Sequence, residues 1–179
     1  MFKKSLIALT LTVSAIGSYA QIYIQGSAGK GTMSFDCGTN VCVKSNSGNK
    51  FLMGYNTGTG LSYEGQIINY GKITSSAFQD VTGTGYGGNV AYLGNFNDQF
   101  GYRVAGGLAR NKVQSPSITA APTTSSWQAA VSGGLSYNFN KSVALTMDYD
   151  LSPGKLAQSA TTTTTASMSL LSIGLRANF

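Results

Sequence analysis

Residues able to do chemistry are few in this sequence, and histidine is missing altogether. The charged residues make up only 10% of the 179 residues, well below the roughly one quarter that is usual in a soluble domain. Without histidine, neither a Ser-His-Asp triad nor a Cys-His pair can activate a nucleophile, and no imidazole can bind a metal. We therefore expect neither enzymatic activity nor a cofactor or metal centre.

Two cysteines, Cys37 and Cys42, are the only ones in the chain. In an exported protein such a close pair is expected to form a disulfide, and the small ring would stabilise the fold by about 2 kcal/mol. The rival interpretation is a metal site. Two cysteines without any histidine make a poor zinc site, so we favour the disulfide.

The first twenty residues have the pattern of a secretory signal. Lys3 and Lys4 precede an apolar run that is too short to span a membrane as a helix, and Ser18-Tyr19-Ala20 forms a small-x-small cleavage site. The sequence thus predicts a signal peptide over 1–20 and one domain over 21–179. The twelve basic residues are scattered along the chain, which gives no footprint for nucleic acid.

Eight later segments alternate apolar and polar residues, the period of a β-strand with two different faces. They cover residues 22–31, 50–56, 61–70, 85–96, 100–110, 127–139, 142–151 and 168–179. The connections after the second, fourth and sixth segments are short, and the others are long. Short turns at one rim and long loops at the other are typical of transmembrane barrels. We therefore predict an all-β fold, an eight-stranded antiparallel up-and-down transmembrane barrel.

A glycine motif at residues 83–88 formally matches G-x-G-x-x-G. A dinucleotide site needs a strand before this motif and a helix after it, whereas residues 89–96 have the pattern of a strand. We interpret these glycines as part of a loop and the start of a strand.

The alternation fits two barrels that are inside out relative to each other. A soluble, lipocalin-like barrel would place the apolar face inside around a ligand, and a membrane barrel would place it against lipid. The polar face carries charges near the short-turn ends of the strands, among small residues that suit a narrow interior. We therefore predict that the apolar face meets lipid and that the lumen holds a charge network of Glu64, Arg103, Asp148, Asp150 and Arg176. Within it we expect Asp148 to pair with Arg176 across adjacent strands.

The layout, the lumen charges and the C-terminal strand resemble the eight-stranded outer-membrane barrel family that includes the OmpA transmembrane domain and OmpX. The resemblance extends over residues 21–179 and ends on an alternating apolar set that is similar to the assembly signal of such barrels: Leu171, Ile173, Leu175, Ala177 and Phe179. It implies a place in the bacterial outer membrane, contact with outer-membrane lipid, and recognition of the last strand by the barrel assembly machinery.

Two functions follow as alternatives from this fold. The first is a structural or surface-interaction scaffold, expected to be monomeric, that presents four extracellular loops to a possible ligand. The second is a narrow, charge-gated pore through the lumen, although eight strands leave an interior that side chains can fill. A soluble secreted β protein is a third and weaker alternative.

Overall fold

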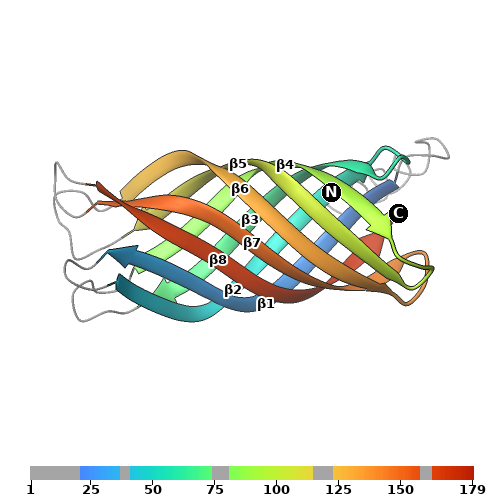
Figure 1. The fold of residues 1–179 in the computed structure, drawn as a ribbon, viewed down its shortest axis with the longest axis horizontal. Helices are drawn as coiled ribbons and strands as arrows, with labels where there is room; N and C mark the ends of the chain where they lie inside the picture. The colour runs from blue at the N-terminus through green and yellow to red at the C-terminus, as the bar shows by residue number, and fades with distance from the viewer. Residues whose placement is uncertain (1–20, 37–40, 74–80, 115–122, 158–162) are drawn as a thin grey trace, which may run out of the picture.

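The computed structural model describes residues 21–36, 41–73, 81–114, 123–157 and 163–179. These residues form eight strands, and each strand pairs antiparallel with the next. The last strand also pairs with the first, so the sheet closes into a barrel (Figure 1). The strands are β1 (Gln21–Asp36), β2 (Val41–Asn56), β3 (Leu61–Ile73), β4 (Val81–Asn95), β5 (Phe100–Gln114), β6 (Thr123–Asn138), β7 (Val143–Ala157) and β8 (Thr163–Asn178). No helix long and apolar enough to cross a membrane occurs in this described part of the chain.

The short-turn ends of the strands lie within a residue or so of the predicted boundaries. In each of the three turns an asparagine side chain accepts hydrogen bonds from backbone amides of the turn. Asn56 accepts a hydrogen bond from the amide of Gly58, at 2.8 Å. Asn97 and Asn140 each accept two backbone amides in the same way. An asparagine side chain that caps its own turn fixes where a strand must stop. Gly58 and Gly60 adopt φ of 86° and 87°, a conformation that favours glycine.

The opposite ends of the strands extend beyond the predicted segments. The regions expected as loops at 32–49, 71–84, 111–126 and 152–167 are in large part strand. They are rich in Ser, Thr and Gly and lack a clean apolar alternation, so their sequence carried little strand signal. Thr163–Thr165 belongs to β8, which fits the tendency of threonine to occur in strands.

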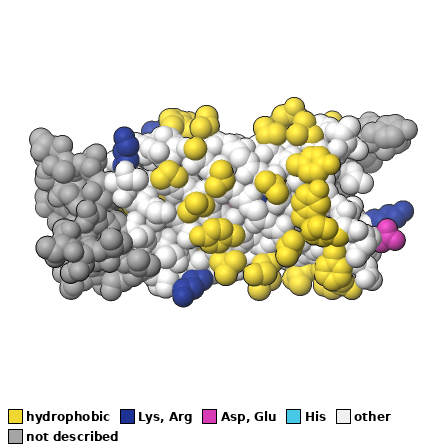
Figure 2. Space-filling view, viewed as in Figure 1, with side chains coloured by type: hydrophobic (Ala, Val, Ile, Leu, Met, Phe, Trp, Pro, Cys, Tyr) yellow, Lys and Arg dark blue, Asp and Glu magenta, His cyan; other side chains and the backbone are white. Residues whose placement is uncertain are grey.

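The apolar residues of the alternating pattern face outward. Large apolar side chains such as Val104, Trp127, Ile173 and Leu175 are 57–62% exposed. On the face shown in Figure 2 they spread over the middle of the barrel, whereas Lys, Arg, Asp and Glu side chains lie only toward its two ends. A surface of this kind is suited to lipid and not to water, which decides between the two inside-out alternatives.

The structure shows where the C-terminal apolar set and the glycine motif lie. Leu171, Ile173 and Leu175 of β8, together with Phe179 directly after it, are 45–64% exposed, and β8 closes the barrel against β1. The glycine motif at 83–88 lies wholly within β4, so no helix follows it. Residues 1–20 and Cys37 lie outside the described residues, and the signal peptide and the disulfide stay predictions.

Candidate functional site

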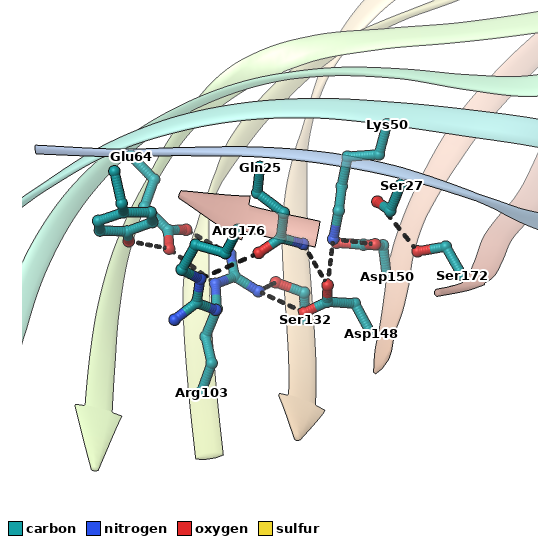
Figure 3. Close-up of polar contacts among 11 residues, drawn as sticks. Gln25, Ser27, Lys50, Glu64, Arg103, Ser132, Asp148, Asp150, Ser172 and Arg176 are labelled. Atoms are coloured by element: carbon teal, nitrogen blue, oxygen red, sulfur yellow. Dashed lines mark hydrogen bonds and ion pairs between the residues drawn. The ribbon is translucent and has the colours of Figure 1, made fainter. Parts of the chain in front are cut away.

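The lumen contains two ion-paired clusters contributed by strands that are far apart in the sequence (Figure 3). In the first, Lys50 of β2 reaches across the lumen to β7, with its Nζ 2.7 Å from Asp150 Oδ2 and 3.3 Å from Asp148 Oδ2. In the second, Arg103 of β5 grips Glu64 of β3 through both carboxylate oxygens, and its Nε lies 2.7 Å from Oε1. Bidentate pairing of this kind is the strongest form of a carboxylate–guanidinium contact.

Asp148 joins the two clusters. Its Oδ1 lies 3.7 Å from Nη1 of Arg103, and its Oδ2 accepts a hydrogen bond from the side-chain amide of Gln25. The same nitrogen of Arg103 donates to the hydroxyl of Ser132, at 2.8 Å. Because one carboxylate contacts both Lys50 and Arg103, the two clusters form a single network.

A third cation borders this network on the side of the short turns. Arg176 donates from Nε to Oε1 of Gln25, at 3.3 Å, and its guanidinium lies 5.1 Å from the centre of the Tyr23 ring. The hydroxyl of Tyr23 donates to Glu64, at 2.6 Å. Among the described residues, Arg176 makes no ion pair, and Gln25 and Tyr23 link it to the acidic groups.

Two inward glycines give the side chains of this network the space in which they meet. Gly54 lies opposite Tyr23 on one side and Glu64 on the other, and a Cβ placed on it would lie 2.2 Å from the Tyr23 ring. Gly134 lies between Arg103 and Asp148 in the same manner, and its Cβ would lie 2.3 Å from Oδ1 of Asp148. Tyr23 passes over Gly54 and Asp148 passes over Gly134, because neither glycine has a side chain.

Burial and charge balance characterise the network as a whole. Each of its charged residues is at most 8% exposed, and three cations balance three anions: Lys50, Arg103 and Arg176 against Glu64, Asp148 and Asp150. A buried charge is tolerated only when it is paired and hydrogen-bonded. Ion pairing explains how this narrow interior accommodates five of the six charges, and the sixth, Arg176, is held by Gln25 and the Tyr23 ring.

The structure brings together four of the five residues predicted for the lumen charge network. Glu64, Arg103, Asp148 and Asp150 belong to the ion-paired network, whereas Arg176 borders it through Gln25. All five side chains face the lumen.

The predicted direct pairing of Asp148 with Arg176 is wrong. In the ladder between β7 and β8, Asp148 lies opposite Ser172, and Arg176 lies opposite Ala144. Four positions along a strand correspond to about 13 Å. Counting residues from the turn and from the C-terminus placed both at one level, but the register of the closed barrel separates them.

Sequence reasoning missed Lys50, Tyr23 and Gln25. The alternation of β2 did contain the signal for Lys50, because Phe51, Met53 and Tyr55 on the apolar face leave it on the inward face. The alternation of β1 places Tyr23 and Gln25 on its polar face, but nothing in their local sequence indicates that they contact Glu64 and Asp148.

A second layer fills the lumen toward the long-connection end, and the sequence did not predict it. Eight buried side chains form an apolar cluster there: Met33, Ile68, Tyr70, Val81, Val113, Ala166, Met168 and Leu170. Four of them, Met33, Val81, Val113 and Ala166, belong to regions predicted as loops, so an interior of only small and charged residues was expected in error. At the opposite rim a polar cavity of about 670 Å³ reaches Tyr23 and Arg176.

The described residues contain no group of three or more Cys, Asp or Glu that could hold a metal ion. Every carboxylate of the described network is paired with a cation. What this arrangement does chemically is to neutralise and fill the interior of the barrel.

Comparison with known proteins places this fold. No family model and no curated protein matches the sequence. Among solved structures, Neisserial surface protein A matches with a TM-score of 0.70 and 17% identity, covering 88% of this chain and 97% of that one. The N-terminal β-barrel domain of Pseudomonas aeruginosa OprF matches with a TM-score of 0.57 and 14% identity, covering 89% and 97%. The attachment invasion locus protein Ail of Yersinia pestis, in complex with sucrose octasulfate, matches with a TM-score of 0.52 and 13% identity, covering 89% and 99%. By its fold, this chain is a small eight-stranded transmembrane β-barrel of the outer-membrane type.

Proposed function

We propose that the protein is a closed scaffold in the outer membrane that displays its long connections at the cell surface. The observation that carries this proposal is the filling of the lumen at two levels. The ion-paired network of Lys50, Arg103 and their acidic partners occupies one level, and the apolar cluster around Met33 and Met168 occupies the other. An interior filled in this way supports the barrel and leaves function to its outer surfaces.

The length of the strands supports the same role. Strands of 13 to 16 residues at roughly 3.3 Å per residue and a tilt of about 40° extend roughly 33–40 Å along the barrel axis. The apolar band of such barrels is only about 25 Å tall. The barrel wall therefore rises beyond the lipid and carries the long connections away from the headgroups.

The fold relatives add support of a general kind. One of them is named a surface protein, and another, named for attachment and invasion, was solved with a heparin analogue bound. By comparison with these proteins, we propose that the long connections interact with an extracellular ligand. We propose further that the barrel acts as a monomer and that assembly machinery recognises its last strand together with Phe179, which follows that strand and is 64% exposed.

A second candidate is the narrow, charge-gated pore. The observation that favours it is the polar cavity at the short-turn rim, which leads inward as far as Tyr23 and Arg176. For ions to pass, both the network and the apolar cluster beyond it would have to open.

One experiment with two readouts tests the scaffold against the pore. An epitope inserted within residues 115–122 should be accessible to antibody on intact cells, and the purified barrel should show no conductance steps in planar lipid bilayers. A matched variant, Met33→Ala with Met168→Ala, thins the apolar cluster and shows whether the recording can detect an opened lumen. Conductance steps in the unmodified protein would favour the pore, and an epitope hidden on intact cells would reject surface display.

A further inference from the structure

Basic side chains gather on the outer wall of the barrel near its long-connection end. Five outward positions there carry a cation: Lys30, Lys72, Arg110, Lys112 and Lys155. None of the outward side chains that the structure describes on β4, β5 and β6 is acidic. The lumen charges balance one another internally, so the described outward side chains at this end of β4, β5 and β6 carry a net positive charge.

The arrangement is most specific on β4, β5 and β6. Arg110 lies directly opposite Tyr86 on β4 and directly opposite Trp127 on β6. Both aromatic side chains face outward, with 42% and 62% of their surface exposed. Lys112 follows two residues later on the same face of β5, so two cations are stacked beside a pair of aromatic rings.

Tyr86, Arg110, Lys112 and Trp127 form a basic and aromatic row on the outer wall. The neighbours of Arg110 along β5 show at which depth in the membrane this row lies. Leu108, one outward position nearer the short turns, is 59% exposed and belongs to the lipid-facing apolar surface. Arg110 and Lys112 come next, so the wall changes from apolar to basic over a single step. Exposed Tyr and Trp side chains favour the boundary between hydrocarbon and headgroups, where one part of the ring is apolar and the other wet. The row therefore lies at the level of the lipid headgroups.

Arg110 is held by only one described hydrogen bond of its side chain, from Nη2 to the hydroxyl of Ser125 at 3.2 Å. Serine is neutral, so this contact orients the guanidinium without neutralising it. The remaining donors of the planar guanidinium suit the oxygens of a phosphate, and the ammonium of Lys112 adds a second charge.

We propose that Tyr86, Arg110, Lys112 and Trp127 form a binding site for the phosphorylated headgroup of a lipid in the outer leaflet. Arg110 and Lys112 bind the phosphate, and the two rings flank the sugar or glycerol part and the upper acyl chains. This site lies on the lipid-facing wall, and it does not depend on whether the long connections serve a surface-interaction role.

The test uses the single tryptophan of the chain as its reporter. The full barrel is placed in phosphatidylcholine nanodiscs, and Trp127 fluorescence is recorded while a bis-phosphorylated, acylated glucosamine disaccharide is added. The dephosphorylated form of the same lipid is the lipid control. Inorganic phosphate and sucrose octasulfate, added to discs without the glycolipid, test for soluble anions as the source of the phosphate or sulfate.

Two double variants separate a local site from general attraction. Arg110→Gln with Lys112→Gln removes the proposed ligands, and Lys30→Gln with Lys155→Gln removes the same charge from other outward positions at that end of the barrel. All four side chains are exposed, and heat-modifiable gel mobility verifies that each variant is folded.

We expect saturable binding of the phosphorylated lipid only, weakened about 25-fold by the first double variant and unchanged by the second. Equal weakening in both variants would overturn the site in favour of diffuse attraction. An equal response to the dephosphorylated lipid would overturn phosphate recognition. A saturating response to inorganic phosphate or sucrose octasulfate alone would overturn the assignment to a lipid.

Discussion

The ion pair between Lys50 and Asp150 allows a quantitative test of the lumen network. Replacing Lys50 by Met removes the cation that lies 2.7 Å from Asp150 and 3.3 Å from Asp148. Asp148 keeps Arg103 at 3.7 Å, but Asp150 loses its only described ion pair, and both carboxylates are at most 2% exposed. An uncompensated buried charge typically costs about 3–5 kcal/mol. We expect Lys50→Met to lower the free energy of unfolding by that amount at neutral pH.

A double-mutant cycle then isolates the interaction. Asp150→Asn should cost less, about 1–3 kcal/mol, because Lys50 keeps Asp148 as its partner. The double variant should be more stable than the sum of the two losses by about 1–3 kcal/mol. Urea unfolding from lipid vesicles, followed by Trp127 fluorescence and gel mobility, measures all four proteins. The exposed Lys155→Met is the matched control and should change stability by at most about 0.5 kcal/mol.

Additive losses would refute this reasoning. They would mean that water in the lumen solvates Lys50 and Asp150 separately and that the short distances have no energetic consequence. The same outcome would weaken the scaffold proposal, because a hydrated network blocks ions poorly.

Three further predictions test the outer wall, the lumen and the cysteine pair. On the outer wall, Ile173→Arg should cost about 2–4 kcal/mol in urea titrations, whereas Ser167→Arg, nearer the long-connection end of the same strand, should cost about 0–1 kcal/mol; equal costs would reject the lipid level assigned to Ile173. In the lumen, Gly134→Val should destabilise the barrel by more than Gly133→Val, since only the inward glycine faces Asp148 at 2.3 Å from its added Cβ; the reverse order would contradict the network geometry. For the cysteines, alkylation without reductant should label neither Cys37 nor Cys42, and two labelled thiols would disprove the disulfide.

The sequence predicted the barrel well where local chemistry decides the structure. Alternation defined the inward and outward faces of all eight strands, and asparagine turns such as Asn97 and Asn140 fixed the short rim. The far ends were missed because Ser, Thr and Gly can continue a strand without an apolar pattern to reveal it. This omission also hid the apolar cluster, since Met33, Val81 and Val113 lie beyond the segments that alternate clearly.

The candidate site depended on information that no single strand contains. Lys50 meets Asp150 from β2 to β7, across the lumen, so its partner is determined by closure of the sheet and not by a neighbouring ladder. The register of β8 on β7 separates Arg176 from Asp148, and residue counts from the ends of the chain could not reveal that shift. The alternation of side chains along each strand therefore identifies which charges share the lumen, whereas the register between strands in the closed barrel decides which of them pair.

Glycine placement links this interior to the function of the outer wall. Gly54 and Gly134 each let two large side chains meet over them, so the network fills its level of the lumen with few residues. A lumen that is charge-balanced within the wall adds no net field outside, and no described acidic side chain on β4, β5 or β6 opposes Arg110 and Lys112. Recognition by this barrel is therefore expected on the outward row of Arg110 and on the connections above it, whereas the lumen serves to hold the wall in place.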